Sequence, residues 1–156
     1  MLKSISAVGL VLISSGTISL SAQAASLGNI FGALAGRSGE MGHEKSVDNA
    51  LVKVAAQINR QTPMAVDKST RLDKVSTEPG QKLTYHYTLP GTTGSDIKSA
   101  DFQKLISPSL TTRVCGSPEM QKFLRSGVTI AYLYRDKDGK PIGGAKVAPL
   151  DCSSRS

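Results

Sequence analysis

The four tyrosines are the residues whose type and spacing suggest a function most directly. They occur as two i, i+2 pairs, Tyr85 with Tyr87 and Tyr132 with Tyr134. Apolar and polar residues alternate through residues 82–89, and large apolar residues occupy every second position of residues 128–134. This alternation predicts β-strands, and side chains two residues apart lie on the same face of a strand. If the two strands are neighbours, an exposed group of four rings would bind another protein. Because aliphatic side chains share that face, we favour core packing, with some hydroxyls at the rim.

Acid–base and metal chemistry has weaker candidates. His86 lies on the polar face of its strand, and no nucleophile or carboxylate accompanies it in a catalytic pattern. His43 and Glu44 form an isolated pair, whereas a metal site in a protein normally has three or four ligands. The segment 136–139 is similar to the start of a calcium loop, but its Asp-Lys-Asp-Gly sequence is typical of a hairpin turn. We predict no catalytic residues, no metal and no cofactor, and we keep His86 with the tyrosines as a candidate binding surface.

Cys115 and Cys152 are the only cysteines. In an oxidising compartment, two cysteines that lie far apart in sequence predict one structural disulfide. A redox role is disfavoured because there is no Cys-x-x-Cys spacing. Closing a loop of this length stabilises a fold by roughly 3–4 kcal/mol on the chain-entropy estimate.

The first 24 residues predict export. Lys3 supplies a positive charge, an apolar run extends from Ile5 to Leu20, and Ala22-Gln23-Ala24 forms a signal-peptidase site. We expect cleavage after Ala24, a periplasmic or secreted mature protein, and no stable membrane insertion after that cleavage; an uncleaved anchor is the alternative. About 130 residues remain, which suits one domain.

The chain is basic, with a formal net charge of +7, but its lysines and arginines are scattered rather than grouped in runs. A nucleic-acid-binding protein usually gathers such residues on one face with aromatic residues among them. We therefore expect no nucleic-acid partner. Loose attraction to anionic surfaces remains a second interpretation of the charge.

Domain limits follow from composition. Repeated glycines in residues 25–45 predict a flexible linker, residues 46–152 a single α+β domain, and residues 153–156 a tail. Within the domain, Ser46 is expected to be a helix N-cap, and Pro63 ends the helical pattern. The spacing places a set of apolar residues on one face of this helix: Val47, Leu51, Val54, Ala55 and Ile58.

Two β-hairpins and a helical segment follow that first helix. Leu72 and Val75 are three residues apart, so they can share one face of the first strand only if it contains a bulge. Pro108 is expected to end one helix and to open another. A third helical segment is expected to start at Ser117-Pro118-Glu119, to bury Phe123 and Leu124, and to end at Gly127. The expected architecture is an antiparallel sheet of two hairpins, about four strands, with the N-terminal helix and the central helical segment packed on one face.

One resemblance covers about two-thirds of the chain. It is carried by Ile58-Asn59-Arg60-Gln61-Thr62-Pro63-Met64, Val66-Asp67, Thr70-Arg71-Leu72, Val114-Cys115, Gly127-Val128 and Asp151-Cys152. These segments resemble a family of small exported bacterial α+β domains that have one disulfide and no established function. The resemblance supports the disulfide and the domain limits, and it implies no active site.

These observations favour a non-enzymatic accessory domain of the bacterial envelope that binds another envelope or secreted protein, as an inhibitor, an immunity-type protein or a helper subunit. The alternatives are a small periplasmic enzyme, whose site would combine residues such as His86, Asp67 or Asp73, and a weak binder of envelope polyanions.

Overall fold

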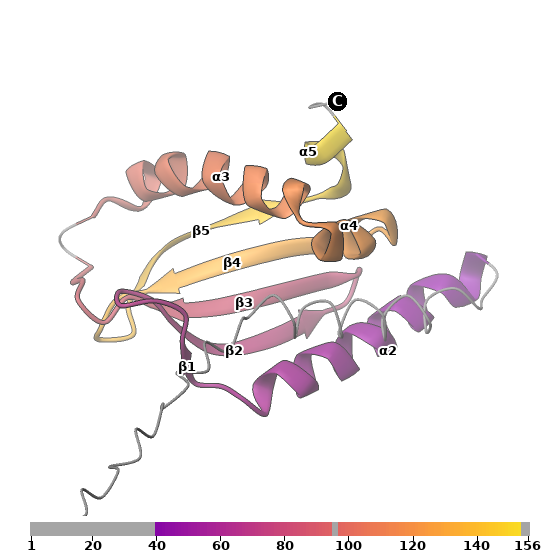
Figure 1. Ribbon diagram of the computed structural model, residues 1–156, viewed down its shortest axis with the longest axis horizontal. Helices are drawn as coiled ribbons and strands as arrows, with labels where there is room; N and C mark the ends of the chain where they lie inside the picture. The colour runs from indigo at the N-terminus through magenta and orange to yellow at the C-terminus, as the bar shows by residue number, and fades with distance from the viewer. Residues whose placement is uncertain (1–39, 95–96, 154–156) are drawn as a thin grey trace, which may run out of the picture.

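The computed structural model describes residues 40–94 and 97–153, in which a five-stranded sheet carries helices on one face (Figure 1). In chain order the elements are α2 (Glu40–Asn59), β1 (Met64–Ala65), β2 (Arg71–Glu78), β3 (Lys82–Thr88), α3 (Ser99–Gly116), α4 (Pro118–Arg125), β4 (Thr129–Arg135), β5 (Pro141–Val147) and α5 (Pro149–Ser153). The predicted α+β class is confirmed, with one strand more than expected. The expected signal peptide and residues 25–39 of the expected linker lie outside the described residues.

The sheet has the order β1-β2-β3-β4-β5, and its central pair differs from the expectation. The pairs β1–β2, β2–β3 and β4–β5 are antiparallel, whereas β3 and β4 run parallel. The reason is the crossover: α3 and α4 carry the chain back along the sheet, so β4 starts at the same end as β3. The sheet is therefore mixed rather than fully antiparallel.

Helix α2 begins at Glu40, six residues before the predicted N-cap, so residues 40–45 of the expected linker are helical. Gly42 does not prevent this, because one glycine costs a helix only about 1 kcal/mol. The predicted apolar face is confirmed: Val47, Leu51 and Val54 are fully buried against the sheet.

The C-terminal end of α2 is joined to β2 by a side chain. The Asn59 amide donates to the Val75 carbonyl over 2.8 Å and accepts from the Val75 N–H over 2.7 Å. Strand β1 pairs only with Leu72 and Arg71, so Asn59 supplies the next pair of hydrogen bonds at this edge of the sheet. The helix is thereby fixed in register with the strand.

Strand β2 contains the bulge that Leu72 and Val75 need in order to lie on one face. The pairing with β3 shifts between Leu72 and Lys74, and both Leu72 and Val75 are buried. The shift has a second effect, because it places Ser76 on the same face of the sheet as His86, across from Thr84.

The prediction that Pro108 ends a helix is wrong, because α3 is continuous from Ser99 to Gly116 with the proline inside it. Pro108 is exposed, and the Ser107 hydroxyl donates to the Gln103 carbonyl over 2.7 Å in the same turn. Burial of Phe102, Leu110 and Val114 on the sheet side keeps the helix together on both sides of the proline.

The next helix was predicted correctly. Ser117 caps α4 by accepting from the Met120 N–H, Phe123 and Leu124 are buried, and Gly127 follows with a positive φ of 85°. None of the described helices is both long and apolar enough to cross a membrane.

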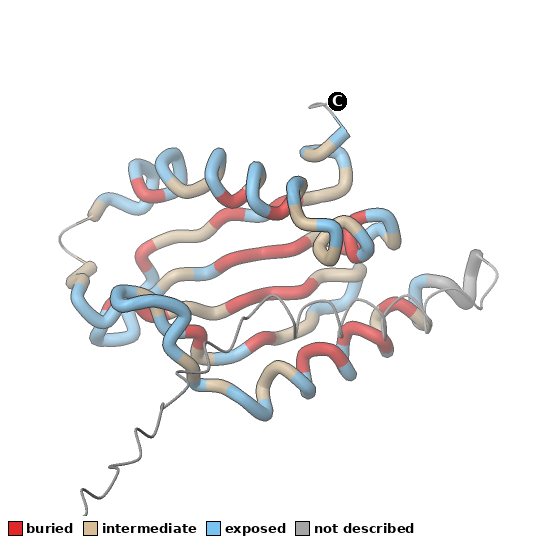
Figure 2. The backbone as a smooth tube through the Cα atoms, viewed as in Figure 1, coloured by how far each residue is buried: buried red, intermediate tan, exposed pale blue. Residues whose placement is uncertain are grey.

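The core lies between the helices and one face of the sheet, where buried residues of β2 to β5 form a continuous band (Figure 2). The predicted disulfide between Cys115 and Cys152 is present, with 5.4 Å between the two Cα atoms. It joins the end of α3 to α5, so it ties the C-terminal turn to the helical layer.

Candidate functional site

The four tyrosines form one row across the parallel strands β3 and β4, which we call the tyrosine row. The strand register places Tyr85 beside Tyr132 and Tyr87 beside Tyr134. Ring centroids are 5.5 Å apart for Tyr85–Tyr132, 6.3 Å for Tyr87–Tyr132 and 5.2 Å for Tyr87–Tyr134, and the corresponding ring planes lie within 19° of parallel. Phe102 of α3 extends the row by an edge contact with Tyr134 at 5.2 Å.

Burial divides the row into two parts. Tyr85 and Tyr132 are 9% and 7% exposed and belong to the core, whereas Tyr87 and Tyr134 are half-buried at its margin. No described side chain hydrogen-bonds to any of the four hydroxyls. No polar side-chain atom of the described part is buried without a partner. The row thus has its buried part, Tyr85 and Tyr132, in the core, and its margin, Tyr87 and Tyr134, is only partly covered.

Burial also affects the ionisation of the row. It raises the pKa of Tyr85 to about 12. Burial, and then the neighbouring tyrosines, raise the pKa of Tyr87 and Tyr132 further, although Arg113 of α3 partly opposes this effect. All four phenols therefore stay neutral at physiological pH, and they offer hydrogen bonds rather than charge.

His86 does not join the tyrosines. It alternates with Tyr85 and Tyr87 along β3, so it lies on the opposite face of the sheet, next to Leu133 of β4. Burial, and then the positive charges of Lys74 and Arg135, lower the pKa of His86. The candidate surface that the sequence suggested is therefore two surfaces on opposite faces of the sheet.

One contact of His86 was not predicted. Its Nε2 atom lies 2.8 Å from the Ser76 hydroxyl, which is the spacing of a nucleophile and its general base. The third member of a catalytic triad is absent among the described residues, because Asp73 bonds Arg71 and Thr88 instead of the imidazole. In addition, the backbone N–H groups with which β2 and β3 face each other are used in the hydrogen bonds between the two strands. They are therefore not free to stabilise an oxyanion, as a hydrolytic site would require.

The acidic candidates have structural partners. Asp67 accepts from the Ser69 N–H in the β1–β2 loop. The turn predicted at Asp136 is confirmed, because this segment joins β4 to β5. In the described segments, no group of three or more His, Cys, Asp or Glu residues could hold a metal ion.

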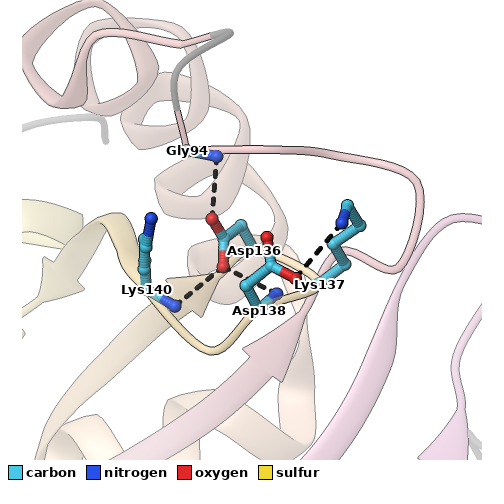
Figure 3. A network of polar contacts seen from close by, with 5 residues as sticks. All are labelled: Gly94, Asp136, Lys137, Asp138 and Lys140. Carbon is cyan, nitrogen blue, oxygen red and sulfur yellow. Dashed lines mark hydrogen bonds and ion pairs between the residues drawn. The ribbon is translucent and has the colours of Figure 1, made fainter.

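Asp136 is only 1% exposed, and its carboxylate accepts from the backbone N–H groups of Gly94, Asp138 and Lys140 at 2.7–2.9 Å (Figure 3). Burial alone would raise the pKa of Asp136, but these three N–H groups hold it below its ordinary value. The residue thus fastens the loop that follows β3 to the β4–β5 turn.

Three solved structures share the fold. A Pseudomonas aeruginosa protein named only for its inferred secretion is 18% identical, has a TM-score of 0.61, and aligns over 70% of this chain and 95% of its own. The pilotin of the Vibrio vulnificus type 2 secretion system is 12% identical with a TM-score of 0.56, over 70% of this chain and 94% of its own. The Vibrio cholerae type II secretion system pilotin is 10% identical with a TM-score of 0.56, over 73% of this chain and 100% of its own.

At these identities the likeness concerns the fold. No curated protein matches the sequence. A family model, however, matches residues 46–142, which is more than half of the chain. The expected resemblance to a family without an established function is confirmed, and the chain belongs to the family described as Domain of unknown function (DUF8479).

Proposed function

We propose that the protein is a non-enzymatic accessory protein of the bacterial envelope, and that it binds a partner protein through the exposed margin of the tyrosine row. The observation that carries this proposal is the margin of the row, where Tyr87 and Tyr134 are only half-buried while their rings are stacked nearly parallel to those of the core. Tyrosines held in this way bind with little loss of side-chain entropy, because their rotamers are already fixed.

The contact would be centred on Tyr87 and Tyr134, whose rings are half-buried, with Phe102 beside them. A partner side chain placed there would contact ring edges and exchange hydrogen bonds with neutral phenols. Tyrosine is enriched among the residues that dominate binding energy at protein interfaces because it combines these two properties.

Location supports the same proposal. The tripartite N-terminal sequence and the disulfide suit a protein that works in the periplasm or outside the cell. Two of the proteins that share the fold are pilotins of secretion systems, so a helper role in an envelope assembly is the form of accessory function that we favour.

Site-specific photo-crosslinking in cells tests the proposal. Tyr134→p-benzoylphenylalanine places a crosslinker at the margin of the row, and Lys53→p-benzoylphenylalanine places one on the exposed side of α2 as the matched control. We expect one discrete adduct from position 134 and none of the same size from position 53. Identical adduct patterns at the two positions, or no adduct at position 134, would contradict binding through the row.

A further inference from the structure

The face of the sheet opposite the tyrosine row has an uneven distribution of charge. The strand registers define it: Lys74, His86, Leu133 and Gly144 form one row across β2 to β5, and Ser76, Thr84, Ala131 and Lys146 form the next. Arg135 stands beside Thr88 in a third row. We call this the helix-free face, because the described helices pack on the other side.

The two carboxylates of this face are already neutralised. Asp73 pairs with Arg71 over 2.6 Å and accepts from the Thr88 hydroxyl. Glu78 pairs with Lys82 over 2.9 Å and also accepts from the Thr84 hydroxyl. Both acids thus have their cations on the same face.

Three exposed cations remain without a described carboxylate: Lys74, Arg135 and Lys146. At strand spacings of about 4.8 Å and about 7 Å between rows, they lie within about 20 Å of one another. Leu133 stands among them, and 41% of its surface is exposed. An apolar side chain surrounded by separated cations is the composition of a surface that adsorbs to anionic lipid.

We infer that the helix-free face binds the surface of an anionic phospholipid bilayer, with Lys74, Arg135 and Lys146 at the headgroups and Leu133 at the acyl boundary. An acidic protein segment is the less suitable occupant. A segment that is added as a strand would extend the sheet at its outer strands, β1 or β5, whereas Leu133 lies at the centre of the face on β4, which has both edges paired. Adsorption by this face would turn the tyrosine row away from the membrane.

Vesicle co-sedimentation of the exported protein tests the charges. Wild type should bind vesicles of mixed phosphatidylglycerol and phosphatidylcholine at low salt, should not bind pure phosphatidylcholine, and should be released by added salt. The triple variant Lys74→Gln, Arg135→Gln, Lys146→Gln should lower the partition coefficient by about 100-fold, since each cation near the surface contributes about fivefold.

The matched control is Lys53→Gln, Lys68→Gln, Lys104→Gln, which removes the same charge from exposed positions outside the strands. It should bind almost as wild type does. Equal losses in the two triple variants, or no binding of wild type, would overturn the inference. So would binding to soluble polyglutamate that matches vesicle binding and is lost in the same variant, because the face would then accept an acidic chain.

A tryptophan introduced at position 133 reports on the apolar part of the contact, because the chain has no other tryptophan that would contribute to the emission. The emission of Leu133→Trp should shift to the blue on anionic vesicles, and brominated lipid should quench it. Val52→Trp, at a position 54% exposed on α2, should show neither change. An unshifted spectrum at position 133 under conditions in which the protein sediments with vesicles would remove Leu133 from the contact and refute the proposed orientation.

Discussion

Tyr132 offers the sharpest test of how the sheet and its helices fit together. It occupies the middle of the tyrosine row, with the Tyr85 ring at 5.5 Å and the Tyr87 ring at 6.3 Å, and it is 7% exposed. Two variants separate its ring from its hydroxyl: Tyr132→Ala removes both, and Tyr132→Phe removes only the hydroxyl.

The magnitudes follow from these contacts. Truncation of a buried aromatic side chain costs about 3–5 kcal/mol. Each of the two ring pairs contributes about 0.5–1.5 kcal/mol of that cost beyond the area buried. No described side chain hydrogen-bonds to the Tyr132 hydroxyl, so Tyr132→Phe should change the free energy of unfolding by less than about 0.5 kcal/mol.

Urea unfolding followed by far-UV circular dichroism measures both variants, and an unchanged m value would show that the midpoint shift reports stability. Leu133→Ala is the control, because it alters the next residue of β4 on the opposite face and should cost less than about 1 kcal/mol. If Tyr132→Ala shifted the midpoint no further than Leu133→Ala, the helices would not cover the tyrosine side. A loss of 1.5 kcal/mol or more in Tyr132→Phe, on the order of a buried hydrogen bond, would show that the hydroxyl contributes a hydrogen bond to the core and would contradict this prediction.

Three further predictions concern other parts of the molecule. Asn59→Ala should lower the free energy of unfolding by about 2 kcal/mol in the same urea assay, because it removes two hydrogen bonds to the edge of β2. The control is Gln57→Ala, at an exposed position two residues earlier in α2, and an equally small loss in both variants would contradict this role of Asn59. Thiol titration of the unfolded, unreduced protein should detect no free thiol, and reduction of Cys115–Cys152 should cost about 4 kcal/mol on the chain-entropy estimate; two reactive thiols per chain would exclude the bridge. Because the pKa of His86 is lowered in the folded protein, the unfolded chain binds a proton more readily, and stability should fall as the pH drops below about 6.5. His86→Gln should show a smaller fall. If the urea midpoints of wild type and His86→Gln changed in parallel from pH 7 to 5.5, this assignment would be refuted.

Local sequence rules predicted several elements because each depends on a few neighbouring residues. The spacing of Val47, Leu51 and Val54 predicted the buried face of α2, and the odd spacing of Leu72 and Val75 predicted the bulge. Ser117 and Gly127 marked the two ends of α4 and its following turn. In each case the signal and its structural result lie within a few residues of each other.

Features that depend on distant segments were missed. The parallel pairing of β3 with β4 depends on the path of the crossover, and the continuity of α3 through Pro108 depends on burial against the sheet. The Ser76–His86 contact required the strand register after the bulge. The tyrosine spacing predicted one face for all four rings, but only the three-dimensional fold separated core rings from marginal ones.

The parallel seam between β3 and β4 also has a consequence for assembly. It pairs Lys82 with Thr129, 47 positions further along the chain, whereas the hairpins on either side close over short turns. The two halves can thus form from local contacts first and dock along the seam afterwards, because distant pairing carries the larger loop-closure cost. Each half contributes two tyrosines to that seam, and the chain has no tryptophan. The tyrosine band of the near-UV circular dichroism spectrum is therefore a built-in optical signal for the docking of the halves, separable from the formation of their helices and hairpins.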